Sequence, residues 1–349
     1  MRISCFLHHP GDLSSRSGMH PLAAALGASV VFYEGTWWKV QQRSWSLGKG
    51  LRTWGQKVYG SEWNSLVPVW DEFRLAGKML PQQDIAHFLW GEFAAPKTAQ
   101  FRRKAKRIVA TYHASASRLP TVLSGCRAFK QLDGITLMSE TQKSYFIEQG
   151  IPEERIAVIL HGMDSSYFHP AEQRTGEPGE PLRGFMIGVT ERDHAFLAEV
   201  CRALPPGLLN LSVATSRDQQ VHYQGLSGVT LLPRLDDPGL LRTYQQSDLL
   251  LMPVMDCTAN NSILESMACG TPVMTNRIGG VPEYVPDECN VVMPDKTLTD
   301  WVDRIQKLAT NRDQLEAMRP RVRAWAQSLD WHTVAGHYIS FYEELKGMR

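Results

Sequence analysis

The 349-residue sequence is poor in the features that hold metals, disulfides or nucleic acids. Its six cysteines include no C-x-x-C pair and have no histidines at zinc-ligand spacing, so neither a disulfide framework nor a metal site is predicted. The formal net charge of +1 argues against nucleic acid held by overall basicity. No apolar run approaches the ~20 residues that cross a bilayer. These absences favour a protein of a reducing, cytoplasmic compartment.

Short apolar runs alternate with helical patterns through most of the chain. They lie at 3–7, 29–33, 85–89, 108–112 and 135–138, and again at 184–188, 209–214, 229–232, 249–253, 273–275 and 290–293. Runs that are apolar on both faces are typical of parallel strands covered by helices on both sides. The pattern predicts an α/β fold with two doubly wound sheets and a cleft between them.

A turn-rich segment divides the two halves. Residues 169–181 contain three prolines and two glycines and show no apolar periodicity. We therefore predict a first domain at 1–168, a linker at 169–182, a second domain at 183–330 and a C-terminal helix at 331–349.

The most informative segment is DCTANNSILESMACGTPVMTNRIGGVPEYV, residues 256–285. Its polar start caps a helix that ends at Gly270, because Pro272 forbids continuation. The unpaired amides at the start of such a helix can bind a phosphate. Glu265 lies one turn further along, where its carboxylate can accept hydrogen bonds from two ribose hydroxyls. From spacing alone, a glutamate that stabilises its own helix N-terminus is an equally good interpretation.

This segment resembles the donor-binding motif of retaining GT-B glycosyltransferases, particularly family 4, the glycosyl transferases group 1. Weaker similarities to the same family lie at Ala110–His113, Ser139–Gln142, Ile156–Asp164 and Gly188–Asp193. The resemblance implies two Rossmann-like domains, of which the first binds the acceptor and the second binds the nucleotide sugar. It also implies that the C-terminal helix crosses back to the first domain.

The resemblance implies a role for particular residues. Glu265 corresponds to the family's ribose-binding glutamate, and Arg192 lies where the family places a cation against the diphosphate. His113 is similar to the family's histidine beside the donor sugar, and Gly18 is similar to a residue of its glycine-rich loop. Donor binding is expected from Gly18, Arg192, Asn260, Asn261, Ser262 and Glu265, and catalysis from His113, Arg192 and Asp256.

Two residues depart from the family's pattern. Cys257 stands where the family has a glutamate that contacts the donor sugar, and we expect it on a loop that faces the cleft. Asp256 or Asn260 could reach the same hydroxyls. The family's lysine after the first strand of the second domain is also missing, and His194 is nearest to its place. The diphosphate therefore depends more on Arg192 and on helix-end amides.

By the same resemblance, the expected activity is transfer of a sugar, with retention, from a nucleotide sugar to a glycan, lipid-linked or small-molecule acceptor. UDP or GDP is the expected nucleotide. No resident cofactor or metal is expected, since no Asp-x-Asp occurs in a donor-site context. Two alternatives stay open: a non-catalytic nucleotide-sugar-binding module, and an epimerase or phosphorylase with the same fold.

Two basic segments and a group of histidines carry weaker functional signals. Residues 36–60 hold five cations, no acid and several aromatic rings, which suits the anionic inner face of a membrane, an acceptor glycan, or a loop packed on its own domain. The basic run at 101–107 is predicted as a solvated helix face. His8, His9 and His20 follow the first strand and are either site residues or structural ones.

Overall fold

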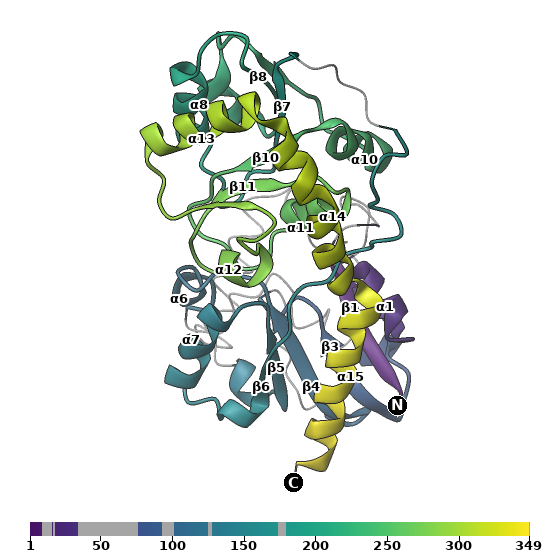
Figure 1. Ribbon diagram of the computed structural model, residues 1–349. Helices are drawn as coiled ribbons and strands as arrows, with labels where there is room; N and C mark the ends of the chain where they lie inside the picture. Colours follow the sequence, from purple (N-terminus) through teal and green to yellow (C-terminus); the bar gives the residue numbers. More distant parts are fainter. Residues whose placement is uncertain are drawn as a thin grey trace. The chain divides into compact units, whose positions relative to one another are not determined.

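The computed structural model describes residues 1–8, 16, 18–33, 76–92, 101–124, 128–173 and 179–348. These residues form two compact units (Figure 1). The first unit comprises Met1–His161 and Trp331–Arg349, and the second comprises Gly162–Asp330. His9 and the basic aromatic segment at 36–60 lie outside the described residues. Within the described part of the chain, no helix combines the length and the apolar composition needed to cross a membrane.

The first unit is built on a parallel sheet with strand order β2-β1-β3-β4-β5-β6. Its strands are β1 Ile3–His8, β2 Ser29–Tyr33, β3 Gln83–Phe88, β4 Ala105–Tyr112, β5 Gly134–Leu137 and β6 Ile156–Val158. Its described helices are α1 His20–Ala25, α6 Leu119–Val122, α7 Lys143–Glu148 and α15 Trp331–Gly347, with short 3₁₀ turns at Ala128–Gln131, Glu140–Gln142 and Glu153–Arg155.

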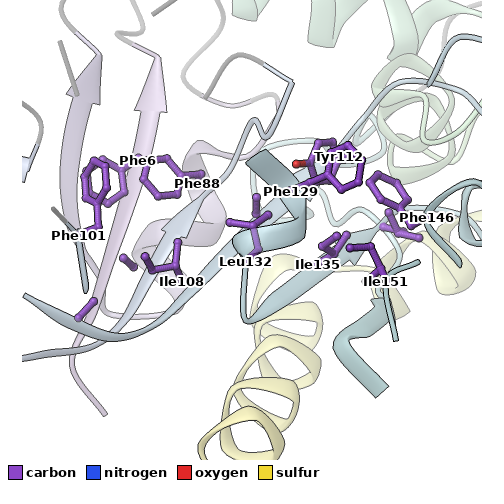
Figure 2. Packing of buried hydrophobic residues seen from close by; sticks show 14 of the residues in the cluster. Phe6, Phe88, Phe101, Ile108, Tyr112, Phe129, Leu132, Ile135, Phe146 and Ile151 are labelled. Carbon is purple, nitrogen blue, oxygen red and sulfur yellow. The ribbon is translucent and has the colours of Figure 1, made fainter. Parts of the chain in front are cut away.

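Aromatic rings form much of the core of the first unit (Figure 2). The rings of Phe6 and Phe88 stack with centroids 4.4 Å apart, and Phe101 packs edge-on against both. Offset and edge-to-face pairs of this kind add to the free energy gained by burying the rings. The stacked pair joins β1 to β3, and the parallel pairing of β1, β3 and β4 brings their carboxyl ends to one edge.

The C-terminal helix α15 packs in the first unit, as the resemblance implied. Its Tyr342 hydroxyl lies 2.6 Å from Nδ1 of His87 in β3, and Nε2 of the same ring lies 2.7 Å from Oγ1 of Thr111 in β4. Gly134 has no side chain where the helix approaches, and a Cβ there would stand 2.5 Å from Leu345. A buried polar network and a close approach at a glycine thus join the end of the chain to the sheet.

The second unit is built on a parallel sheet with strand order β12-β11-β10-β7-β8-β9. Its strands are β7 Leu182–Ile187, β8 Leu209–Ala214, β9 Val229–Leu231, β10 Leu249–Met252, β11 Val273–Asn276 and β12 Val291–Met293. Its helices are α8 His194–Ala203, α9 Arg217–Gln220, α10 Asp237–Gln246, α11 Asn261–Ala268, α12 Val281–Tyr284, α13 Leu298–Thr310 and α14 Arg312–Ser328, with a 3₁₀ turn at Val221–Tyr223. The strand order reverses between β7 and β10, and ligands of such sheets bind outside the strand ends at that point.

The predicted α/β fold with two doubly wound sheets is confirmed. The division between the units falls between His161 and Gly162, ahead of the predicted linker at 169–182, whose first residues lie in the second unit. Gln245 Nε2 donates to the His169 carbonyl, which binds this stretch to α10.

The basic run at 101–107 is not a solvated helix face, because its second half begins β4. Two of its cations form ion pairs within the unit: Arg102 pairs with Asp133, and Lys106 pairs with Asp84. Arg107 donates to the carbonyls of Leu345 and Met348 at the end of α15. The run therefore serves the fold of the first unit.

Candidate functional site

The loops that follow β7 and β10 meet at the point where the strand order of the second sheet reverses. Asp193 N donates to the Pro253 carbonyl at 2.9 Å, and Met255 N donates to the Glu191 carbonyl at 2.9 Å. Glu191 has a φ of 61°, a left-handed conformation that costs free energy in a residue other than glycine. These contacts place Arg192 beside the segment that leads into α11.

Helix α11 is held at both ends by side chains. Asn260 is its N-cap and accepts a hydrogen bond from Ser262 N at 3.1 Å, as its residue type predicts. At the other end, Arg323 of α14 donates to the Ala268 carbonyl at 2.7 Å, and Gly270 adopts a φ of 70° that stops the helix. The position of the N-terminal amides is thereby fixed.

Arg192 reaches the N-terminus of α11. Its Nη2 donates to Asn260 Oδ1 at 3.0 Å and its Nη1 donates to the Thr190 carbonyl, while its Nε is buried and has no hydrogen-bond partner in the described structure. Burial lowers the pKa of the guanidinium, which remains a cation at physiological pH. Gly188 lies directly against this group, since a Cβ there would stand 2.9 Å from Arg192 Nε. A fixed cation with an unfilled donor therefore faces the helix end.

Glu265 is buried on α11, with 3% of its surface exposed. Its Oε2 accepts a hydrogen bond from the hydroxyl of Tyr244 at 3.0 Å. Tyr244 belongs to α10, and burial raises the pKa of its hydroxyl well above the usual value, so the hydroxyl keeps its proton and acts as the donor. The motif pointed to Glu265 but not to Tyr244, which carries no signal in the sequence because a buried tyrosine is ordinary core.

The structure corrects the expected position of Cys257. Its side chain is buried, with Sγ 3.2 Å from the Thr258 carbonyl, and does not face solvent. Asp256 Oδ1 accepts from Cys257 N at 2.7 Å, and Gly280 N donates to the Cys257 carbonyl at 2.7 Å. The loop is thus folded on itself and on a glycine turn, and the role of Asp256 toward a sugar remains a prediction.

His194 does not supply the charge of the missing lysine. Its Nδ1 lies 2.9 Å from the Tyr223 hydroxyl, and its Nε2 lies 2.9 Å from the Gly188 carbonyl. Burial lowers the pKa of the ring, which keeps it neutral. Lys296 is a cation that the sequence analysis did not select, and it pairs with Asp193 at the start of α8.

The first unit places His113 at the end of a strand and Gly18 shortly before a helix. His113 follows β4, stacks on Trp90 with centroids 3.7 Å apart, and lies with Nε2 2.7 Å from the Leu89 carbonyl. Its backbone amide donates to the carboxylate of Glu92, whose pKa is raised by burial. Gly18 has a φ of 73° just before α1.

Of the three histidines predicted as either site or structural residues, the structure describes the side chain of His20. The ring of His20 stacks on Phe32 within the first unit, with centroids 6.3 Å apart, which fits a structural residue. The side chains of His8 and His9 lie outside the described structure. Among the residues that the structure does describe, no group of three or more His, Cys, Asp or Glu side chains could hold a metal ion.

The chain has the GT-B fold, with two units that each carry a doubly wound parallel sheet. Solved structures that match its whole length include Anabaena HepE in complex with UDP-glucose, with a TM-score of 0.70, 15% identity and 100% of both chains covered. Sucrose-phosphate synthase from Thermosynechococcus elongatus matches with a TM-score of 0.69 and 14% identity, over 99% of this chain and 100% of the other. At these identities the likeness concerns the fold.

Residues 189–311 match the family model described as Glycosyl transferases group 1. This segment contains Arg192, Asn260 and Glu265, so the resemblance inferred from the motif is confirmed. D-inositol 3-phosphate glycosyltransferase of Corynebacterium jeikeium is 30% identical over 225 residues, which are 54% of this chain and 52% of that protein. The protein of the same name from Segniliparus rotundus is 25% identical over 211 residues, 54% of this chain and 47% of that protein. The matched region thus spans about half the length of these relatives.

Proposed function

We propose that the chain is a retaining glycosyltransferase whose second unit binds a nucleotide sugar at the N-terminus of α11. The observation that carries the proposal is the meeting of Arg192, the capped start of α11 and Glu265 at the point of strand-order reversal. A cation and helix-end amides suit a diphosphate, and a buried carboxylate one turn into α11 suits ribose hydroxyls. Similar structures named with UDP and UDP-glucose support a uridine nucleotide, with GDP as the alternative.

The reaction would exchange one bond at the anomeric carbon for another. The bond to the diphosphate oxygen breaks, the acceptor oxygen bonds on the same face, and the acceptor proton passes to the departing phosphate. Arg192 and the amides of Asn261 and Ser262 would stabilise the charge that grows on the leaving diphosphate. These groups act without a metal, so we expect transfer to survive an excess of EDTA. His113 in the first unit is proposed to act at the donor sugar.

The acceptor is proposed to be a hydroxyl-bearing small molecule, a glycan or a lipid-linked saccharide. The similar proteins named D-inositol 3-phosphate glycosyltransferase favour the first class. We further propose a cytoplasmic protein that binds the inner face of a membrane through residues 36–60. Cosedimentation with anionic vesicles that falls as salt rises, and that is lost when the five cations of this segment become Gln, would support this.

A thermal-shift panel of UDP, GDP, ADP and their sugars tests the proposed function. A nucleotide at a hundred times its dissociation constant adds about 2.7 kcal/mol to the free energy of unfolding. Glu265→Gln should weaken the preferred nucleotide roughly tenfold or more, because a charged acceptor becomes neutral. Glu199→Gln, an exposed position on α8, is the matched control and should bind as the wild type does.

Nucleotide release separates the alternatives. The buried Cys257 in place of a sugar-contacting glutamate is the observation that favours a non-catalytic binding module. A module of that kind would bind UDP-sugars and release no UDP over hours, with or without acceptors. Slow release by hydrolysis that accelerates with an acceptor would identify a transferase, and an epimerase would change the sugar without releasing UDP.

A further inference from the structure

The side-chain oxygen of Asn260 receives two donors that suit a phosphate oxygen. Ser262 N, at the start of α11, donates to Asn260 Oδ1 at 3.1 Å, and Arg192 Nη2 donates to the same atom at 3.0 Å. A helix-end amide combined with a guanidinium is a common pair of donors for phosphate in proteins. Asn260 is buried, with 5% of its surface exposed, so its carboxamide holds this place largely out of contact with water.

A second observation shows that the Arg192 guanidinium can donate beyond its contact with Asn260. Arg192 Nε is buried and lacks a partner in the described structure, although a buried donor without an acceptor is costly. The carboxamide of Asn260 satisfies one edge of the guanidinium and leaves Nε unfilled. Gly188 keeps the space beside Nε clear of a side chain, since any Cβ would stand 2.9 Å from it.

We propose that Asn260 is an internal competitor of the donor's diphosphate. Its carboxamide oxygen occupies the place of one phosphate oxygen while the site is empty and leaves that place when the diphosphate binds. This inference rests on the proposed function, because it takes the ligand of Arg192 to be a diphosphate. A charged phosphate oxygen binds a guanidinium more strongly than a neutral amide oxygen does, so the exchange favours the bound state.

The competition has a functional consequence. Each binding event must first break two hydrogen bonds to Asn260, which lowers the affinity for the nucleoside diphosphate product as well as for the donor. Because product release limits the turnover of many enzymes, weaker binding of the product favours turnover. The carboxamide also keeps the Arg192 guanidinium in place between turnovers.

Two substitutions at Asn260 act in opposite directions while they preserve the helix. Asn260→Gly removes the competitor and weakens the N-cap only slightly, because glycine is itself a common N-cap residue, whereas Asn260→Asp caps as well as Asn does. The aspartate would bind Arg192 more strongly and repel the diphosphate. We expect Asn260→Gly to bind UDP and inorganic pyrophosphate roughly threefold to tenfold more tightly than the wild type, and Asn260→Asp to bind both at least about tenfold more weakly.

Calorimetry with UDP, GDP, inorganic pyrophosphate and uridine measures these affinities. Uridine lacks phosphates, so its affinity should be the same in the wild type and both variants. Weaker pyrophosphate binding by Asn260→Gly would overturn the inference and make Asn260 a residue that positions Arg192 for the donor. Equal affinities in all three proteins would also overturn it, leaving Asn260 a helix cap. A wild type that binds neither pyrophosphate nor a nucleoside diphosphate would instead refute the proposed function.

Discussion

At the residue scale, the proposed donor site depends on the residues that hydrogen-bond to Glu265 and Arg192 as much as on these two residues themselves. Glu265 is held by Tyr244 of α10, and Arg192 is held by the cap of α11. Glu265, Tyr244 and Asn260 are buried, where hydrogen bonds are stronger than in water and the loss of one leaves a costly unpaired group. The partners should therefore affect binding of the nucleotide.

Tyr244→Phe is predicted to reduce the discrimination between UDP and 2′-deoxy-UDP. Without the tyrosine hydroxyl, the Glu265 carboxylate loses an oriented hydrogen bond of about 1.5 to 3 kcal/mol and holds the ribose less precisely. Tyr223→Phe is the matched control, because Tyr223 is also buried but bonds to His194. If Tyr244→Phe keeps the wild-type ratio of the two affinities while Glu265→Gln changes that ratio, Tyr244 is not a positioning residue.

At the scale of single elements, the turn at Gly279 and Gly280 supports the loop that precedes α11. Gly279 has a φ of 53°, and a Cβ there would stand 2.4 Å from the Cys257 carbonyl and 2.5 Å from Asp256 Oδ1. Backbone atoms cannot move aside as the end of a long side chain can. The turn and the loop therefore determine each other's conformation.

Gly279→Ala is predicted to lower both the melting temperature and the affinity for UDP. Gly225 is the matched control, because its φ is 74° and a Cβ there would meet nothing within 4 Å. Gly225→Ala should cost about 1 kcal/mol from the left-handed backbone alone. Gly279→Ala should cost more, since the collision displaces the loop at Asp256. Equal melting temperatures and equal UDP affinities for the two variants would contradict this.

The attachment of α15 through His87 predicts a dependence of stability on pH. Burial lowers the pKa of His87 to about 3, against about 6.5 in the unfolded chain. At a pH between these two values, the unfolded state binds a proton at His87 that the folded state does not bind. The stabilisation of the fold by the neutral His87 ring is therefore complete above pH 6.5 and is lost as the pH falls. The loss is about 1.4 kcal/mol per pH unit in that window.

Thermal unfolding of the wild type and of His87→Gln at pH 7.5 and pH 5 tests this. The variant lacks the titrating ring, so the advantage of the wild type over the variant should shrink by roughly 2 kcal/mol at the lower pH. Subtracting the variant's curve removes the contributions of the other titrating groups. A difference that is constant between the two pH values would show that His87 does not titrate in this way.

At the scale of the whole molecule, the predicted residues divide between the two units. The nucleotide-binding candidates other than Gly18 lie in the second unit, whereas His113 lies in the first, stacked on Trp90. Binding of the nucleotide and chemistry at the sugar should therefore respond differently to substitution.

His113→Ala is predicted to keep the UDP affinity within about twofold of the wild type while the release of UDP from the donor sugar falls roughly a hundredfold or more. Binding measured by calorimetry and turnover measured by UDP release separate the two effects. A parallel loss of affinity and turnover would mean that His113 acts through the fold. Wild-type turnover would remove it from the catalytic group.

Much of the fold was predicted from the sequence because its signals are local. Apolar runs of a few residues determine where buried strands form, and Asn260, Gly270 and Pro272 determine where α11 begins and ends. The resemblance likewise pointed to Arg192 and Glu265, whose roles stay predictions. The strand that begins within 101–107 was predicted wrongly, because it depends on which segments pack together.

The sequence by itself determined two doubly wound sheets and a family resemblance, and it predicted a helix end suited to a phosphate. The tertiary structure decided which side chains meet there: Arg192 with Asn260, Tyr244 with Glu265, and Cys257 turned inward. It also decided that His87 meets Tyr342, which is 255 residues away in the chain. Such contacts leave no mark in a local pattern, because they arise only when packing brings distant segments within hydrogen-bond distance.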